Sequence, residues 1–412
     1  MKNKHDNFFN FLSKALIVNF LLFLYPLPDF FGISFLNSIK AQDTLFYTQD
    51  QPVIDIGRFA RFHIDANDSL TLTQVQALPD AAFQKSKTAV MSFGNTTASI
   101  DIKLYIKNQT TEPLFLSFEN NELQHIELLT LDETGQQTVQ QGGSFAPFSN
   151  RYLQRGNAVL KIGTQPALIY MKVKSHSSFY LPVTVSSSPP LIDLNYKRDV
   201  FKGLTLGIML AMGFYNLFIY FIVRDRLYLL YCLYVLGTIW TFSHINGLWF
   251  FAWSDYSFFN RFLGIQVTAL TAALFSFRFL NSRELTPRLY RLMLVFFVVI
   301  ALMIPIEYLD IQPFTNNFLQ LFIALSSFVL FGAGISAYLQ GNKSAKYYAL
   351  AWVFFLSGAV ITLLCFVGWM PYNFLTINAA VIGTCIENLF LSFALANRIS
   401  IYREESDRKS VV

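Results

Sequence analysis

The sequence predicts a membrane protein with an N-terminal all-β, jelly-roll-like sandwich domain followed by an all-α bundle of seven transmembrane helices. Three observations support this fold class: the composition, a polar segment with short alternating apolar runs over residues 43–190, and mostly apolar sequence over residues 203–396. Apolar residues make up 53% of the 412 residues and charged residues only 14%. So few charges cannot coat the whole surface of the chain, which argues against a wholly water-soluble protein.

Residues 1–41 are expected to be a signal peptide or an uncleaved membrane anchor. Three lysines precede or flank an apolar stretch over residues 8–35, and polar sequence begins after Ala41. A basic start, an apolar middle and a small residue near the end are typical of a secretory signal. Two prolines and an aspartate interrupt the stretch, so both alternatives remain open. Both of them place residues 43–186 outside the cytoplasm.

Residues 43–186 are predicted to form an extracytoplasmic sensor domain built from short strands. Residues 100–106 alternate between apolar and polar side chains, as expected for a half-buried strand. Similar short apolar runs, separated by turn-forming residues, occupy residues 114–118, 123–131, 158–162, 168–173 and 180–185. Strands at this spacing favour a β-sandwich such as a jelly roll. One helical turn is expected at residues 72–77, capped by Thr71 or Thr73.

The most distinctive loop of this domain covers residues 142–151, and it supplies the candidate ligand-binding residues Phe148, Asn150 and Arg151. Its two glycines permit unusual backbone angles. An aromatic face, an amide and a guanidinium suit a sugar or a carboxylate. The alternative is a structural corner in which Arg151 pairs locally.

Seven apolar runs follow a linker at residues 187–202, and they define a transmembrane domain over residues 203–397. Most runs reach the roughly 20 residues needed to cross a bilayer. The seven runs are residues 203–223, 227–249, 258–277, 289–306, 317–339, 347–368 and 374–396. The fourth is the weakest, because Arg291 and Pro305 shorten its apolar core. A short cytoplasmic tail, residues 398–412, is expected to continue the seventh helix.

Charge asymmetry predicts the orientation of the bundle. If the first domain is exported, alternate loops lie in the cytoplasm, where basic residues accumulate. The predicted cytoplasmic loops carry Arg224, Arg226, Arg278, Arg283, Arg288, Arg291, Lys343 and Lys346. The opposite loops carry Arg261 as their only basic residue. The sequence just before the first helix opposes this rule, because it contains Lys197, Arg198 and Lys202.

The intramembrane functional candidates are Glu387, Asn388 and His244. An ionisable side chain that faces lipid costs several kcal/mol, so Glu387 is expected to face the bundle interior or to be protonated. A switch or a proton site is the functional alternative for it, and a helix-to-helix hydrogen bond is the structural one. His244 lies near the outer end of the second run and could equally be interfacial.

No catalytic, metal-binding or cofactor-binding residues are predicted, and the chain is not expected to be an enzyme. The sequence has no HExxH, GxSxG or P-loop motif. No basic cluster interleaves with aromatics in the polar domain, so nucleic acid is not an expected partner. The three cysteines all fall in apolar runs, where they are expected to be small core residues.

The sequence resembles a bacterial family, the seven-transmembrane receptors with diverse intracellular signalling modules. The resemblance covers residues 55–400 and rests on the order and spacing of several pieces. In the first domain these are residues 69–75, the Ser-Phe-Gly-Asn stretch at 92–95, residues 104–108 and the Pro-Phe-Ser-Asn-Arg stretch at 147–151. In the bundle they are residues 215–220, 224–231, 278–280 and 287–288, with Glu387 ahead of residues 391–399.

The resemblance implies a jelly-roll domain that senses small, carbohydrate-like ligands outside the cytoplasm. The family usually has a Trp after the Phe-Gly-Asn stretch, where this chain has Ile100 or Ile102. Family members usually continue into an output domain such as a kinase or cyclase, and this chain ends at Val412. We therefore expect a receptor of the bacterial inner membrane that relays its signal to a separate cytoplasmic protein, with a homodimer as an open alternative. The rival hypothesis is a transporter or channel with an extracytoplasmic binding domain.

Overall fold

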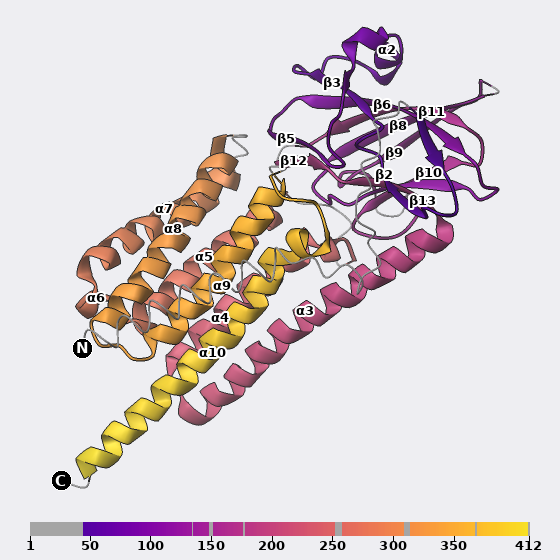
Figure 1. Ribbon diagram of the computed structural model, residues 1–412. Coiled ribbons are helices and arrows are strands. Elements are labelled where there is room, and N and C mark those ends of the chain that lie inside the picture. Colours follow the sequence, from indigo (N-terminus) through magenta and orange to yellow (C-terminus); the bar gives the residue numbers. More distant parts are fainter. Residues whose placement is uncertain are drawn as a thin grey trace.

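The structure is a computed structural model that describes residues 44–133, 135–147, 151–175, 178–251, 258–308, 314–366 and 369–410. It consists of a β-rich unit, residues 44–187, and a helical unit that begins at Ser188 (Figure 1). The predicted signal peptide or anchor, residues 1–41, lies outside the described residues.

Among the described residues, two larger sheets and one small two-stranded sheet form the β-rich unit. The large sheet has the strand order β4 (Gln84–Lys85), β3 (Arg61–Asp65), β6 (Ser99–Asn108), β11 (Ala167–Lys174), β8 (His125–Asp132) and β9 (Gln137–Gly142), and β1 (Thr44–Tyr47) also pairs with β6. The second sheet has the order β10 (Ala158–Gly163), β7 (Leu114–Phe118), β13 (Val183–Ser187) and β2 (Val53–Asp55). The small sheet pairs β12 (Ser178–Leu181) with β5 (Met91–Asn95) in antiparallel fashion.

The predicted alternation over residues 100–106 is confirmed in β6, and it explains the core. Ile100, Ile102, Leu104 and Ile106 all point inward and are buried. Apolar residues of β8 and β11 in the same sheet, and of β7 and β13 in the other sheet, belong to the same core. Because side chains alternate between the two faces of a strand, the polar residues of β6 project from the other face of the sheet. The β-rich unit is therefore a sandwich, as the sequence predicted.

Two local predictions have different outcomes. The short helix expected at residues 72–77 is α2 (Leu72–Gln76), and Thr71 caps it by accepting a hydrogen bond from the Gln74 amide. The apolar run at residues 180–185 is not one strand. Pro182 separates β12 from β13, and these two strands belong to different sheets, because proline cannot donate to a strand ladder.

Among the described residues, seven long helices form the helical unit. They are α3 (Ser188–Val223), α4 (Arg226–Ile245), α5 (Phe258–Phe279), α7 (Pro287–Tyr308), α8 (Phe314–Leu339), α9 (Ala345–Phe366) and α10 (Phe374–Ser410). Within the described ranges, all of them except α5 are long and apolar enough to span a bilayer. The described apolar part of α5, Leu263–Phe279, falls short of that length. The run with the weakest sequence signal, α7, meets the requirement.

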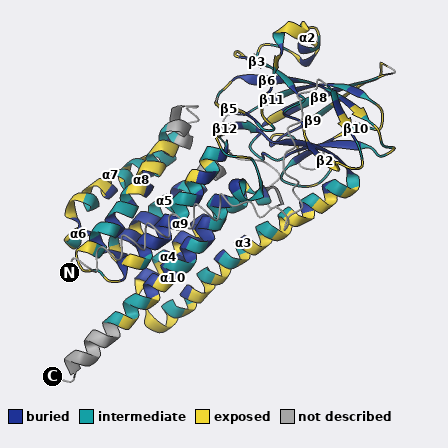
Figure 2. Ribbon diagram, viewed as in Figure 1, coloured by how far each residue is buried: buried dark blue, intermediate teal, exposed yellow. Residues whose placement is uncertain are grey.

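The segment predicted as a linker, residues 187–202, belongs almost entirely to α3. Ser187 ends β13, and the helix begins at the next residue with two prolines in its first turn, where their missing N–H groups cost nothing. A helix of 36 residues is about 54 Å long. Figure 1 shows α3 running from the sandwich along the side of the bundle without a break. Little of its length is buried, and exposed and intermediate residues alternate along it (Figure 2), as expected of a helix that faces lipid.

The last two helices pack with their backbones in close contact. A Cβ atom added to Gly358 of α9 would lie 2.3 Å from the Ala379 carbonyl oxygen, and one added to Gly383 of α10 would lie 2.5 Å from that of Phe354. Small residues allow this close approach. Inside a bilayer the hydrophobic effect does not drive helices together, so van der Waals contacts of this kind hold them together. Beyond the bundle, α10 continues to Ser410, so the predicted extension of the seventh helix is confirmed.

Candidate functional site

The loop singled out from the sequence lies partly within the described structure. Phe148 and Asn150 lie outside the described residues. The Arg151 guanidinium donates to the carbonyl oxygens of Arg155 at 2.7 Å, Gly156 at 2.8 Å and Gly143 at 3.0 Å. Burial lowers the pKa of Arg151 to about 10. In this conformation the Arg151 side chain therefore stabilises the backbone of its own loop. That Arg151 contacts a ligand stays a prediction.

Gly143 shows why this loop needs glycine. Its φ is +102°, and a Cβ there would lie 2.4 Å from the carbonyl oxygen of Gln124. Other residues rarely adopt that backbone conformation, and no side chain would fit in the space. Together, Gly143 and Arg151 direct residues 151–157 toward the bundle.

The sandwich meets the bundle first at α3, where two ion pairs cross between the units. Arg198 of α3 donates to Glu119 in the loop after β7. Asp199 of the same helix accepts two hydrogen bonds of 2.5 Å from Arg155. Glu119 and Arg198 are both largely buried, with 8% and 23% of their side-chain surfaces exposed. Consecutive residues of α3 therefore hold two separate loops of the sandwich.

These contacts explain the basic residues that opposed the orientation rule. Arg198 is neutralised by Glu119, and Lys202 donates to the carbonyl of Asn246 at 3.3 Å. Lys197 pairs with Asp193 one turn earlier in α3, at 2.8 Å. All three basic residues lie on the part of α3 nearest the sandwich, and each of them has a structural partner there.

A second contact joins the sandwich to the turn after α4. The Asn121 amide donates to the carbonyl of Ile245 at 3.0 Å. Gly156 and Gly247 meet so closely that a Cβ on Gly156 would lie 2.8 Å from the Gly247 Cα. The φ of Gly247 is +72°, so glycine suits both the turn and the approach.

A third contact joins the small β5–β12 sheet to the end of α9. The rings of Tyr180 and Phe366 stack with centroids 4.3 Å apart and an interplanar angle of 18°. Ser92 Oγ donates to the Phe366 carbonyl at 2.7 Å. Phe366 thus contacts the sandwich through both its ring and its backbone.

We call these three contacts together the junction. On the sandwich side it consists of Ser92, Glu119, Asn121, Arg155, Gly156 and Tyr180, and on the bundle side of Arg198, Asp199, Lys202, Ile245, Asn246, Gly247 and Phe366. It ties the sandwich to α3, α4 and α9. Any tilt of the sandwich must therefore change at least one of these contacts or move the helices with it.

Asp55 interacts electrostatically with charged residues of the junction. Desolvation raises the pKa of Asp55 to about 6, and repulsion from Glu119 adds to the shift, while attraction to Arg198 and Arg58 opposes it. A carboxyl group that titrates near neutral pH is therefore coupled to the ion pair that holds α3.

Inside the bundle, Glu387 is fully buried on α10, as the sequence predicted. The Tyr234 hydroxyl of α4 faces its carboxyl group, and Tyr231 and Tyr348 are close enough to interact with it electrostatically. Neither carboxyl oxygen has a hydrogen-bond partner among the described residues. An unpaired charge at the centre of a bilayer costs at least about 2.5–3.5 kcal/mol.

Asn388 follows Glu387 on α10 and is also fully buried, but the two side chains do not contact each other by hydrogen bonds. Its carbonyl oxygen accepts a hydrogen bond of 2.8 Å from the Tyr231 hydroxyl of α4. Both polar atoms of its side chain lack a partner in the described part of the chain. His244 lies ten residues beyond Tyr234, about 15 Å further along α4, where it is buried next to the junction. The structure therefore places His244 apart from Glu387.

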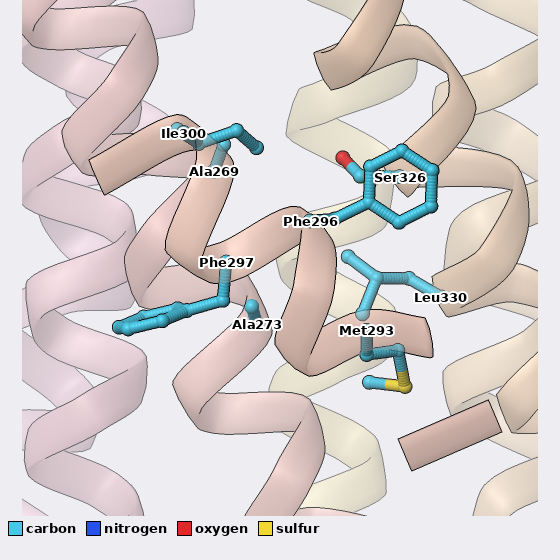
Figure 3. Close-up of a pocket in the computed structure, with 8 residues that line it drawn as sticks. All are labelled: Ala269, Ala273, Met293, Phe296, Phe297, Ile300, Ser326 and Leu330. Atoms are coloured by element: carbon cyan, nitrogen blue, oxygen red, sulfur yellow. The ribbon is translucent and has the colours of Figure 1, made fainter. Parts of the chain in front are cut away.

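A crevice between α5, α7 and α8 offers little room for a ligand (Figure 3). Its lining is almost wholly apolar: Ala269, Ala273, Met293, Phe296, Phe297, Ile300, Ser326 and Leu330. The free volume is about 10 Å³, which is about enough for one water molecule. Across the described ranges, no three His, Cys, Asp or Glu side chains gather in a way that could hold a metal ion.

The fold and the junction define a class of protein: a multi-pass membrane protein whose extracellular β-sandwich is mounted directly on a seven-helix bundle. A family model described as 7TM diverse intracellular signalling matches residues 198–398, and one described as 7TMR-DISM extracellular 2 matches residues 57–187. The chain belongs to this family of seven-transmembrane receptors. No curated protein matches the chain.

The junction is a structural feature that sequence reasoning did not locate. Its partners are far apart in the chain, such as Glu119 and Arg198 or Ser92 and Phe366, and no motif links them. One signal did exist. Three basic residues at the outer end of the first helix go against the orientation rule, and one of them, Arg198, pairs with Glu119 of the sandwich.

Proposed function

We propose that this receptor senses a small, carbohydrate-like ligand outside the bacterial inner membrane and relays a conformational change to a separate cytoplasmic effector, such as a kinase or cyclase. The observation that carries the proposal is the junction, together with the unbroken passage from β13 into α3. A rigid helix that starts inside the sandwich transmits a tilt, whereas a flexible linker would absorb it.

The input helix and the output helix are joined inside the bundle. Asn216 of α3 donates to Ser392 Oγ of α10 at 2.9 Å, and Cys385 of α10 contacts the carbonyl of Thr205 at 3.7 Å. α10 then continues to Ser410 on the predicted cytoplasmic side. A displacement of α3 against the bundle therefore reaches the end of α10 through direct contacts.

The ligand must prefer one arrangement of the bundle over the other. Tight binding with equal affinity for both arrangements would shift nothing. Residues 142–151, with Phe148, Asn150 and Arg151, remain the proposed contact region. Because residues 151–157 lead straight from that loop to Asp199 and Gly247, a ligand that repositions the loop acts directly on the junction.

The first test is a ligand screen on the full chain in lipid nanodiscs, with a panel of mono- and oligosaccharides. A sugar that raises the unfolding temperature supports the ligand class. Spin labels at Val223→Cys and Ser400→Cys then report the distance between the ends of α3 and α10. We expect that distance to change when the sugar is added. A sugar that binds without changing the distance would contradict the relay.

The output end is tested by deleting residues 400–412. We expect the shortened chain to insert and to bind ligand as before, and downstream output to be lost. Unchanged output after this deletion would rule out α10 as the relay.

The alternative, a transporter or channel, is supported by the buried carboxyl group of Glu387. Reconstituted vesicles discriminate between the two functions. A solute flux that disappears in Glu387→Gln would favour transport over signalling.

A further inference from the structure

The carboxyl group of Glu387 is the least satisfied ionisable group among the described residues of the bundle. Its side chain is completely buried, and neither oxygen has a hydrogen-bond partner in the described structure. Tyr231 and Tyr234 of α4 and Tyr348 of α9 are the titratable side chains that face it. No lysine, arginine or histidine in the described ranges pairs with it.

The surrounding hydroxyl groups are already engaged elsewhere. Tyr231 donates to the Asn388 carbonyl at 2.8 Å, and Tyr348 hydrogen-bonds Ser276 Oγ of α5 at 2.7 Å. The Tyr234 hydroxyl is turned toward the carboxyl group, but outside hydrogen-bonding geometry. A carboxylate anion in this position would have neither a counter-ion nor enough donors.

Near Glu387, α9 packs tightly against α10. α9 and α10 are in backbone contact at Gly358 and Gly383, about one to two helical turns before Glu387 along α10. The crevice described above is lined by α5, α7 and α8 and does not reach α10. A proton is the one cation that can neutralise the carboxyl group without requiring space.

We propose that Glu387 is a proton-binding site within the bundle. In the conformation described here the side chain is a neutral carboxylic acid that can donate toward Tyr234. Releasing the proton creates a charge that this packing cannot hold, so the ionised form requires α4 and α10 to separate and admit water. Proton binding and release at Glu387 thereby select between two arrangements of α10, the helix that carries the proposed output.

This inference deepens the proposed function, but its first test is independent of ligand and effector. Infrared spectra of the full chain in nanodiscs are compared for the natural protein and Glu387→Gln, which is neutral and nearly the same size. We expect the difference at neutral pH to contain the carbonyl stretch of a protonated carboxyl group. A difference that contains only carboxylate bands would overturn the proposal.

Two further variants test whether the protonated carboxyl band comes from Glu387 or from a general change in the spectrum. Glu284→Gln changes an exposed glutamate that bonds Asn281 at 2.7 Å, and it should leave the protonated band intact. Tyr234→Phe removes only the hydroxyl that faces the carboxyl group, and it should shift the frequency of that band. An unshifted band in Tyr234→Phe would refute the proposed contact with Tyr234.

The same sample distinguishes a proton from a metal cation. Exchanging sodium for choline at constant pH should leave the protonated band unchanged. A band that disappears on adding sodium would mean that a metal cation displaces the proton, and it would overturn the assignment. A failure of any of these spectral tests leaves the receptor function intact, because that function is tested by the deletion of residues 400–412.

Discussion

Asn216 of α3 and Ser392 of α10 form a hydrogen bond of 2.9 Å in the interior of the bundle, where both side chains are buried. α3 begins at the last strand of the sandwich, and α10 ends at Ser410. The bond thus joins the helix that enters the bundle from the sensor domain to the helix that leaves it toward the cytoplasm. Its strength sets how tightly the two helices move together.

We expect Ser392→Ala to weaken this coupling without unfolding the bundle. The Asn216 amide would keep its bond to the Met212 carbonyl, at 2.9 Å, within its own helix. Side-chain hydrogen bonds between transmembrane helices contribute about 0.6–2 kcal/mol. A double-mutant cycle with Asn216→Ala, read from unfolding in mixed micelles, measures the pairwise term.

The matched control for that cycle is Ser357→Ala. The Ser357 hydroxyl donates to the carbonyls of Val353 and Phe354 in its own helix, at 2.7 and 3.1 Å. It should therefore show no coupling to Asn216. A coupling energy near zero for Asn216 and Ser392 as well would contradict the proposed link between α3 and α10.

The ion pair between Glu119 and Arg198 offers a test of the junction by charge reversal. Either Glu119→Arg or Arg198→Glu places like charges together in a largely buried contact, and we expect each to abolish the ligand-induced distance change. Hydrogen bonds to charged groups contribute about 1.5–3 kcal/mol, so the junction should separate while the sandwich stays folded. The double reversal should restore the response.

The pair of Asp193 and Lys197 serves as the control for charge reversal. It lies one turn away in the same helix, is more than half exposed and does not reach the sandwich. Exposed pairs of this kind contribute little. Reversing it should leave the response intact. If the double reversal of Glu119 and Arg198 fails to restore the response, a specific role for that pair is refuted.

The sequence predicted the architecture well, because each part of it depends on local patterns. The alternation at residues 100–106 identifies β6, and apolar runs with charged ends identify the long helices. Span length was less reliable: α7, with Arg291 and Pro305, qualifies as a span, whereas the described apolar part of α5 falls short. An apolar run in the sequence predicts a helix, but it does not predict how much of that helix is buried by its neighbours.

The site was harder to predict, since it depends on contacts between distant residues. Glu387 could be identified because a carboxyl group in an apolar run is costly wherever it lies. Glu119 and Tyr180 carry no such signal, and they matter only because the fold brings them to Arg198 and Phe366. Arg151 could be singled out as unusual, but its three carbonyl partners depend on how the loop closes.

The glycine contact at the junction provides a purely steric test. Gly156→Ala would place a Cβ 2.8 Å from the Gly247 Cα, so the sandwich must move away from the turn after α4. Overpacking of this kind costs about 1–3 kcal/mol. We expect weaker ligand-induced motion with ligand binding retained. Gly203→Ala is the control, because that position on α3 has open space, and a normal response in Gly156→Ala would show that the close contact is dispensable.

The pH dependence of the junction follows from Asp55, whose pKa is raised from 3.8 to about 6 in the folded protein. The folded state therefore binds this proton more tightly than the unfolded state, and stability falls as pH rises from about 4 to about 6. The full shift would correspond to about 3 kcal/mol. Asp55 is exposed at the end of β2, so solvent screening should reduce the effect to about 1 kcal/mol or less.

Asp55→Asn should remove this penalty. We expect the variant to unfold at a higher temperature than the natural protein above pH 6, and the difference to vanish near pH 4. Asp68→Asn provides the opposite control: desolvation disfavours its charge, but hydrogen bonds from Lys174 and Lys172 outweigh this and lower its pKa to about 2. That variant should be less stable at neutral pH, and its deficit should shrink only as the pH falls below about 4 toward 2. If the gain in Asp55→Asn is the same at all pH values, Asp55 does not titrate at the junction.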